Sequence, residues 1–220
     1  MFINFEGVDG SGKTSVINII TTYLKNQGYD LEITREPGGT SISEQIRQIL
    51  LNPNNTDILP ITEAYLYASA RAQHVFEKIL PALKKNKIVI TDRFLHSSLA
   101  YQGIVKKLGP DLVYKINWEA IDRGVLPNIT FILDVPTEIA KKRMSTDSKR
   151  QADRFDQESV EFHKQVREAF KEIQQRFNFD RSKIFVIDAS KPLEEVAKEI
   201  LDILLPKLEM WKMTKSTFTK

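Results

Sequence analysis

The sequence contains no cysteine among its 220 residues. A disulfide framework and a thiolate metal site are therefore excluded. No apolar run approaches the roughly 20 residues that a membrane-spanning helix needs, so no membrane partner is expected. An apolar, strand-like run begins at Phe2, which argues against a cleavable signal peptide. These absences lead us to expect a cytoplasmic protein.

An excess of charge of one sign is also missing. The chain has 32 basic and 29 acidic side chains, for a net charge of +3. This balance does not indicate a nucleic-acid polymer as partner, and the basic residues are better suited to small phosphorylated ligands. With 41% hydrophobic residues the chain can bury a full core. We expect a single domain over residues 1–205, followed by a partly frayed tail over residues 206–220.

Short apolar segments alternate with amphipathic helical segments along the chain. This order predicts an α/β fold of three layers, a five-stranded parallel sheet with helices on both faces. Strands are expected at Phe2–Glu6, Leu31–Thr34, Ile88–Thr91, Ile129–Asp134 and Ile184–Asp188. Helices are expected over 13–27, over 62–79 with Pro81 marking an end or a kink, after Pro136, over 158–177, and from Pro192 to before Pro206.

The most informative motif is GVDGSGKT, which lies between the first expected strand and the first expected helix. Strand, glycine-rich loop and helix in this order are typical of the P-loop, whose backbone N–H groups surround phosphate oxygens. Lys13 suits the β- and γ-phosphates, and the Thr14 hydroxyl suits Mg²⁺. The motif predicts a P-loop NTPase-type fold that binds ATP through Gly7, Val8, Asp9, Gly10, Ser11, Gly12, Lys13, Thr14 and Ser15.

Charged residues follow two of the expected strands. Asp92 comes directly after the run IVIT, where a carboxylate beside a P-loop can hold Mg²⁺ together with Thr14. Arg93 follows it, Arg35 ends the second strand, and Arg47 lies in the helix after the Pro37–Gly39 turn. Each arginine alone is typical of a protein surface. Together they favour an acceptor substrate that already carries a phosphate.

The segment from Ser145 to Phe155, STDSKRQADRF, is polar and has no apolar period. It fits a solvated connecting loop or a lid, over about residues 145–157, that closes over the triphosphate.

Taken together, these motifs resemble the thymidylate kinase family over Phe2 to Leu204. The resemblance rests on GVDGSGKT, TREPGG, TEAYLYASARAQH, DRFLHSSLAYQG, DRFDQE and VIDAS. It implies phosphoryl transfer from ATP to dTMP with Mg²⁺, in the biosynthesis of dTTP, by a homodimer. Two alternatives stay open: another P-loop kinase, of a deoxynucleoside or of a different nucleoside monophosphate, and a nucleotide-dependent switch or assembly ATPase without an acceptor pocket.

The resemblance also implies roles for particular residues. Tyr67 would stack on the thymine and Arg71 would contact its carbonyl edge, both from one helical face. Tyr101 would exclude a ribose 2′-hydroxyl. The implied dTMP-binding set is Asp9, Arg35, Arg47, Tyr67, Arg71, Arg93, Ser98, Tyr101 and Gln102, and the implied catalytic set is Asp9, Lys13, Arg35, Arg93, Arg150 and Arg154.

Two features depart from patterns seen in the family. His96 stands where the family commonly has Asp, and we interpret it as a residue beside the site and not as a catalytic acid or base. The loop from Gly7 to Thr14 contains no arginine. Phosphoryl transfer still needs positive charge at the transferred group. In bacterial-like members of the family this charge comes from the lid, so the resemblance implies Arg150 or Arg154 for this role, with Lys149 and Arg143 nearby.

Overall fold

The computed structural model describes residues 1–121, 125–146, 153–177 and 182–217. Its centre is a parallel five-stranded sheet of order β2-β3-β1-β4-β5. This confirms the predicted fold class and the five predicted strands, three of which are one residue longer than expected. Their bounds are β1 Phe2–Glu6, β2 Leu31–Arg35, β3 Ile88–Asp92, β4 Ile129–Asp134 and β5 Lys183–Asp188.

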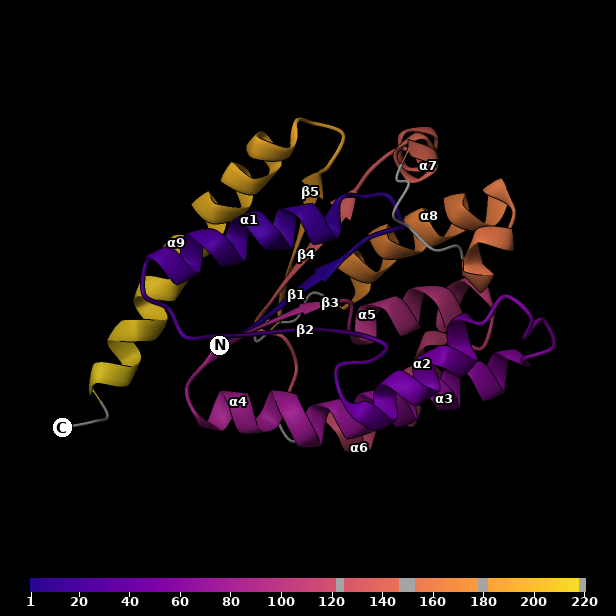
Figure 1. The fold of residues 1–220 in the computed structure, drawn as a ribbon, viewed down its shortest axis with the longest axis horizontal. Helices are drawn as coiled ribbons and strands as arrows, with labels where there is room; N and C mark the ends of the chain where they lie inside the picture. Colours follow the sequence, from indigo (N-terminus) through magenta and orange to yellow (C-terminus); the bar gives the residue numbers. More distant parts are fainter. Residues whose placement is uncertain (122–124, 147–152, 178–181, 218–220) are drawn as a thin grey trace.

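Helices cover both faces of the sheet, as the alternation of apolar strands and amphipathic segments predicts. Helices α1 and α9 pack together on one face, and α4 and α8 contact strands from the other, in a layer that also holds α3, α5 and α6 (Figure 1). The bounds are α1 Lys13–Asn26, α2 Ser41–Leu51, α3 Pro60–His74, α4 Leu80–Lys84, α5 Leu95–Ser98, α6 Pro110–Ile121, α7 Thr137–Thr146, α8 Val160–Arg176 and α9 Leu193–Thr217. Within the described ranges, no helix is both long and apolar enough to cross a membrane.

The central strand β1 explains why the sheet is continuous. All five of its residues, FINFE, are buried, and it pairs with β3 on one side and β4 on the other. Phe5 packs against Phe131 with ring centroids 5.5 Å apart. The pairing of Phe5 with Asp92 and of Arg35 with Asp92 brings the carboxyl ends of β1, β2 and β3 to one edge. Ligands of open parallel sheets bind at this edge.

The long helix predicted over 62–79 does not end at Pro81. A π-helical turn, η1 (Val75–Ile79), joins α3 to α4, and Pro81 lies in the first turn of α4. Proline cannot donate a hydrogen bond and its ring clashes with the carbonyl four residues earlier. A wider π turn directly before it accommodates both effects. Helix α6 and the second π-helical turn, η2 (Leu99–Val105), were not among the predicted elements.

The prediction that the last helix ends before Pro206 is wrong. Helix α9 continues through Pro206 to Thr217, so the segment from 206 to 217 is helical and not a frayed tail. Leu208 is fully buried and Trp211 packs against the core. Burial of these two apolar side chains offsets the hydrogen bond that the proline removes.

Candidate active site

The P-loop connects β1 to α1 and is shaped by glycines. Gly10 has φ +77°, and a Cβ at this position would lie 2.3 Å from the Ala140 carbonyl oxygen, so only glycine fits. Lys13 opens α1 and is buried, and its Nζ donates to the carbonyls of Gly7 at 2.9 Å and Val8 at 3.0 Å. Burial, together with the charge of Arg93, lowers the pKa of Lys13. A cleft of about 680 Å³ lies over the loop and includes every predicted ATP-binding residue from Asp9 to Ser15.

Asp92 and Thr14 lie side by side at the floor of this cleft. Thr14 Oγ1 lies 3.5 Å from Asp92 Oδ2, whereas Asp92 Oδ1 is buried and has no hydrogen-bond partner within the described residues. No cluster of three or more His, Asp or Glu side chains able to hold a metal occurs in the described part of the chain. One carboxylate and one hydroxyl, completed by phosphate oxygens and water, is a ligand set that Mg²⁺ favours. The orphaned carboxylate oxygen therefore fits a magnesium site.

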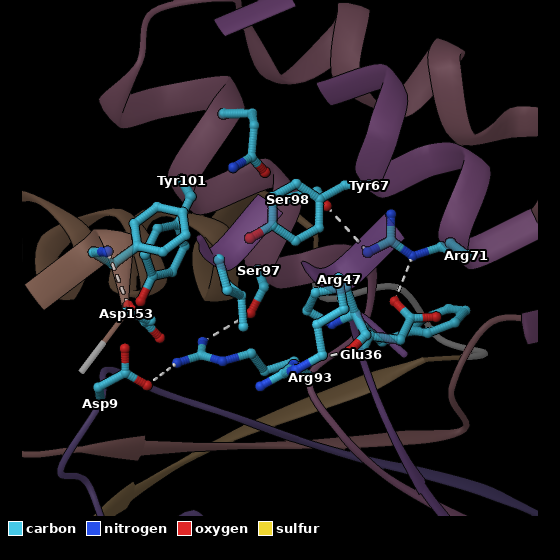
Figure 2. Close-up of a pocket in the computed structure, with 15 residues that line it drawn as sticks. Asp9, Glu36, Arg47, Tyr67, Arg71, Arg93, Ser97, Ser98, Tyr101 and Asp153 are labelled. Atoms are coloured by element: carbon cyan, nitrogen blue, oxygen red, sulfur yellow. Dashed lines mark hydrogen bonds and ion pairs between the residues drawn. The ribbon is translucent and has the colours of Figure 1, made fainter. Parts of the chain in front are cut away.

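Arg93 connects the P-loop to the turn after β3. It has φ +70°, and its strained backbone is held by bonds from its N–H to the Phe5 carbonyl and from Thr91 Oγ1 to its own carbonyl. Its guanidinium donates to Asp9 Oδ1 at 2.7 Å and to Ser97 Oγ at 3.0 Å (Figure 2). Asp9 and Arg93, predicted separately, therefore form one unit.

Glu6 stabilises this turn through hydrogen bonds. The sequence did not predict it as a site residue. It is fully buried at the end of β1 and accepts bonds from the backbone N–H groups of Phe94 and Ser97 and from the Ser97 hydroxyl. Burial raises the pKa of Glu6. The available signal was a carboxylate at the last position of an otherwise apolar buried strand, directly before the P-loop.

Arg35 and Arg47 converge on the loop that follows β2. Both guanidinium groups donate to the Pro37 carbonyl, at 3.1 and 2.8 Å. Arg35 is more exposed and pairs with Glu44, whereas Arg47 lies deeper and its pKa is lowered by burial and by Arg35. The structure brings both arginines to the wall of the P-loop cleft.

A second, narrower pocket lies beside the cleft, between α3 and η2. Figure 2 shows its ring of polar and aromatic side chains. It includes every residue predicted for the nucleoside end of the acceptor, namely Tyr67, Arg71, Ser98, Tyr101 and Gln102. Burial raises the pKa values of Tyr67 and Tyr101 well above the usual value, so both phenols are neutral. The Tyr101 ring packs edge-on against Phe155, with centroids 5.5 Å apart.

The Arg71 guanidinium forms hydrogen bonds with three other side chains at this pocket. Its Nε donates to Glu36 at 2.8 Å, Nη2 donates to the Ser98 hydroxyl at 3.0 Å, and Nη1 donates to Asn117. Glu36 and Asn117 are further residues that the sequence reasoning did not identify. Glu36 stands in the TREPGG motif, but Asn117 lies on the unpredicted α6 and had no sequence signal.

The arginines predicted for the lid separate in the structure. Arg150 lies outside the described residues. Arg154, in the short 3₁₀ helix η3 (Arg154–Gln157), is buried; its Nε donates to the Leu50 carbonyl and its Nη2 pairs with Glu63. The structure therefore does not bring Arg154 to the P-loop. Arg143 on α7 does line the P-loop cleft, where it donates to the Ala189 carbonyl at 2.9 Å.

His96 lies apart from both the cleft and the narrower pocket. It is 4% exposed, and its Nδ1 lies 3.4 Å from Asn4 Nδ2. Burial, helped by the charge of Arg71, lowers the pKa of His96 to about 4. A neutral, enclosed imidazole fits the prediction of a supporting and not a catalytic residue.

The two pockets share four lining residues, Asp9, Glu36, Arg47 and Arg93. A triphosphate on the P-loop and a phosphate on a nucleoside in the narrower pocket would meet at this charged boundary. The parallel sheet, the P-loop and the paired pockets together define a P-loop kinase of small phosphorylated acceptors.

Comparison with known proteins identifies the family. The family described as thymidylate kinase matches residues 5–200. The chain is 46% identical to the thymidylate kinase of Geobacillus sp. strain WCH70 over 94% of this chain and 97% of the relative. It is 47% identical to that of Pediococcus pentosaceus, over 92% and 96%. A crystal structure of thymidylate kinase from Ehrlichia chaffeensis is similar with a TM-score of 0.73 and 33% identity, over 93% and 98%. The chain belongs to the thymidylate kinase family, which confirms the resemblance found in the sequence.

Proposed function

We propose that this enzyme transfers the γ-phosphoryl group of ATP to the phosphate of dTMP. The single observation that carries the proposal is the shared boundary of the two pockets, formed by Asp9, Glu36, Arg47 and Arg93. A switch or assembly ATPase would need no second pocket. In phosphoryl transfer the protein positions the reactants and stabilises the charge that spreads over the equatorial oxygens.

The donor side is built by the P-loop and its neighbours. Lys13, at the start of α1, is within reach of phosphates bound on the loop, where it would exchange its bonds to the Gly7 and Val8 carbonyls for bonds to phosphate oxygens. The helix N-terminus adds its positive end. Thr14 and Asp92 are the residues that would hold Mg²⁺, which when bound supplies positive charge to the phosphate oxygens.

The acceptor side is built by the arginines at the boundary. Arg93 lies between Asp9 and the ring of Tyr101, with its Cζ 5.5 Å from the ring centroid, so it can bind a phosphate above the sugar position. Arg47 and Arg35, which line the same cleft, add forked donors. The acceptor phosphate is ionised at neutral pH, so the reaction needs no general base. Asp9 would hold Arg93, and through it the acceptor, in line.

We propose that Arg143 stabilises the negative charge on the transferred phosphoryl group. Arg150 is the other candidate for this role. Arg143 Nη1 lies 3.9 Å from where a Cβ on Gly12 would stand, which places it against the P-loop. Arg154 contributes to the acceptor pocket instead, through its pairing with Glu63.

The proposal extends to the enzyme's oligomeric state, its location in the cell and its domain organisation. We propose a homodimer packed through helices, supported by exposed apolar side chains on the adjoining helices α2 and α3, including Ile42, Ile49 and Tyr65. We also propose that the enzyme works in the cytoplasm, and that one kinase domain, expected over residues 1–205 and extended to the end of α9 at Thr217, carries a lid at about residues 145–157.

A coupled assay of ADP release tests the activity directly. The acceptors to compare are dTMP, dUMP, dCMP, UMP and AMP, each at saturating ATP and Mg²⁺. We expect the highest kcat/KM for dTMP, with weaker turnover of dUMP, because one methyl group in an apolar pocket contributes only about 1–3 kcal/mol of selectivity. Release of ADP at the same rate without any acceptor would overturn the proposal.

A further inference from the structure

Glu63 contacts Gln102, one of the residues that line the acceptor pocket. It is fully buried on α3, and its Oε1 accepts a hydrogen bond of 2.7 Å from Gln102 Nε2. Its Oε2 contacts two cations, Lys106 Nζ at 2.8 Å and Arg154 Nη2. A carboxylate that pairs with two cations offers them, and Gln102, only hydrogen-bond acceptors.

The orientation of the Gln102 amide follows from this contact. Only the NH₂ group of an amide can face an acceptor, so the bond to Glu63 determines which way the amide points. Gln102 is 1% exposed and lines the acceptor pocket. Within the described residues, no donor is hydrogen-bonded to its Oε1. Glu63 therefore leaves Gln102 with an acceptor oxygen to offer to a ligand.

Two further polar side chains that line the pocket, Arg71 and Ser98, have hydrogens to donate. Arg71 carries N–H groups only, and its Nη2 donates to the Ser98 hydroxyl at 3.0 Å. Because that hydroxyl oxygen accepts from Arg71, its own hydrogen is free to point elsewhere. The pocket thus places one oriented acceptor, on Gln102, near oriented donors on Arg71 and Ser98.

This pattern complements one class of pyrimidine. Thymine and uracil present a C4 carbonyl acceptor beside an N3–H donor, whereas cytosine presents an amino donor beside an N3 acceptor. We propose that Glu63 is a positioning residue that makes the enzyme select thymine and uracil against cytosine by fixing the Gln102 amide. The inference rests on the proposed function and assigns to Arg154 and Lys106 the role of holding the Glu63 carboxylate in place.

The test substitutes Glu63→Gln, whose amide can turn either its oxygen or its NH₂ toward Gln102. The measured quantities are kcat and KM for dTMP, dUMP and dCMP. We expect the ratio of kcat/KM for dTMP over dCMP to fall about tenfold, the size of one hydrogen bond. The loss should lie in KM, with kcat for dTMP near the wild-type value. The dTMP to dUMP ratio should not change, because both bases present the same edge.

A merely structural role for Glu63 would predict a different result. General damage to the pocket would lower kcat/KM for all three acceptors together and leave the dTMP to dCMP ratio within twofold of wild type, and that result would overturn the proposal. Glu168→Gln is the matched control, because it makes the same chemical change on an exposed residue of α8 that pairs with Lys171. It should leave both the dTMP to dCMP and the dTMP to dUMP ratios unchanged.

A double-mutant cycle tests whether Glu63 acts through Gln102. Gln102→Met removes the amide and should lower the dTMP to dCMP ratio by at least as much as Glu63→Gln. The double variant should then lose no more than Gln102→Met alone, since there is no amide left to orient. Additive losses would show that Glu63 acts by another route and would refute the inference.

A measurement on the wild-type enzyme decides the question if Glu63→Gln does not fold. A crystal structure with dTMP should show Gln102 Nε2 still bonded to Glu63 and its Oε1 bonded to N3 of the base. An amide that leaves Glu63, or that donates to the base, would overturn the inference. Failure of the proposed function is distinguishable from either result, because a wild-type enzyme that does not phosphorylate dTMP shows it before any variant is made.

Discussion

Arg93 donates to Asp9 across 2.7 Å and thereby ties the turn after β3 to the P-loop. The two residues are 84 positions apart in sequence, and they lie in the loops that follow the neighbouring strands β1 and β3. An arginine in this position can contact both the donor and the acceptor phosphates. In the proposed reaction the pair would link nucleotide binding on one side of the boundary to acceptor binding on the other.

The first prediction concerns Lys13. Lys13→Ala should lower kcat by about 10²–10³, the size of the loss expected for one preorganised electrostatic group. The fold should survive, because among the described residues Lys13 Nζ bonds to two loop carbonyls and to no side chain. Steady-state kinetics measures the loss and circular dichroism checks the fold. A folded variant with near-normal turnover would contradict the assigned role.

A second prediction separates the arginines of α7, the lid and η3. Arg143→Ala should lower kcat and kcat/KM together by about 10²-fold, because a group that contacts the transition state affects both. Arg154→Ala should instead raise KM for dTMP, because its guanidinium pairs with Glu63 beneath the acceptor pocket. Arg150→Ala completes the series. If Arg143→Ala keeps the wild-type kcat and Arg150→Ala loses most of it, Arg150 and not Arg143 contacts the transferred phosphoryl group.

The positions of the strands could be predicted from the sequence because each strand is a short run rich in Ile, Val, Leu or Phe between more polar segments. FINFE and IVITD are almost entirely buried in the structure, and their residues match the predicted runs closely. The P-loop was equally clear, since its glycines and Lys13 have fixed spacing. Local sequence was sufficient in these cases because each strand and the P-loop are set mainly by their own residues.

The polar network beneath the pockets could not be predicted in the same way. Glu63 binds Gln102, Lys106 and Arg154, residues that are 39 to 91 positions away. Nothing near Glu63 in the sequence indicates these partners. The sequence therefore predicts Arg154 as a lid residue that closes over ATP, whereas the structure pairs it with Glu63. The path of α9 through Pro206 likewise depended on burial of Leu208, a tertiary effect that overrides the local signal of a proline.

A third prediction concerns the proposed magnesium site. Asp92 has one buried oxygen without a hydrogen-bond partner in the described structure, and the other lies 3.5 Å from Thr14 Oγ1. Asp92→Asn keeps the shape but removes the negative charge. The Mg²⁺ concentration for half-maximal activity should rise about 10- to 100-fold, the usual cost of losing a supporting ligand. An unchanged Mg²⁺ dependence would mean that Asp92 does not act on the metal.

A fourth prediction concerns the sugar. Tyr101→Ala should raise kcat/KM for ribosyl-TMP relative to dTMP, because the ring that blocks a 2′-hydroxyl is gone. Tyr101→Phe keeps the ring and is the matched control, so its ratio should stay at the wild-type value. The ratio is the quantity to compare, because Tyr101→Ala also loses packing against Phe155 and should destabilise the fold by about 3–5 kcal/mol. An unchanged ratio in Tyr101→Ala would place recognition of the 2′-position elsewhere.

The last prediction concerns stability at acidic pH and follows from His96. Its pKa is about 4 in the folded protein, against a usual value of 6.5. Between these values the unfolded chain binds a proton that the folded chain does not, so the free energy of unfolding falls as the pH decreases through this range. The shift corresponds to roughly 3 kcal/mol of unfolding free energy, lost progressively between about pH 6.5 and pH 4.

The variant His96→Asn replaces the imidazole by an amide and so removes this titration. The unfolding free energy of the variant should therefore decrease less steeply than that of the wild type over this pH range. Urea unfolding at pH 7, 6, 5 and 4 measures both slopes, and the difference between them isolates His96 from the carboxylates that both proteins share. Parallel pH dependences in the two proteins would mean that His96 titrates near its ordinary pKa in the folded state.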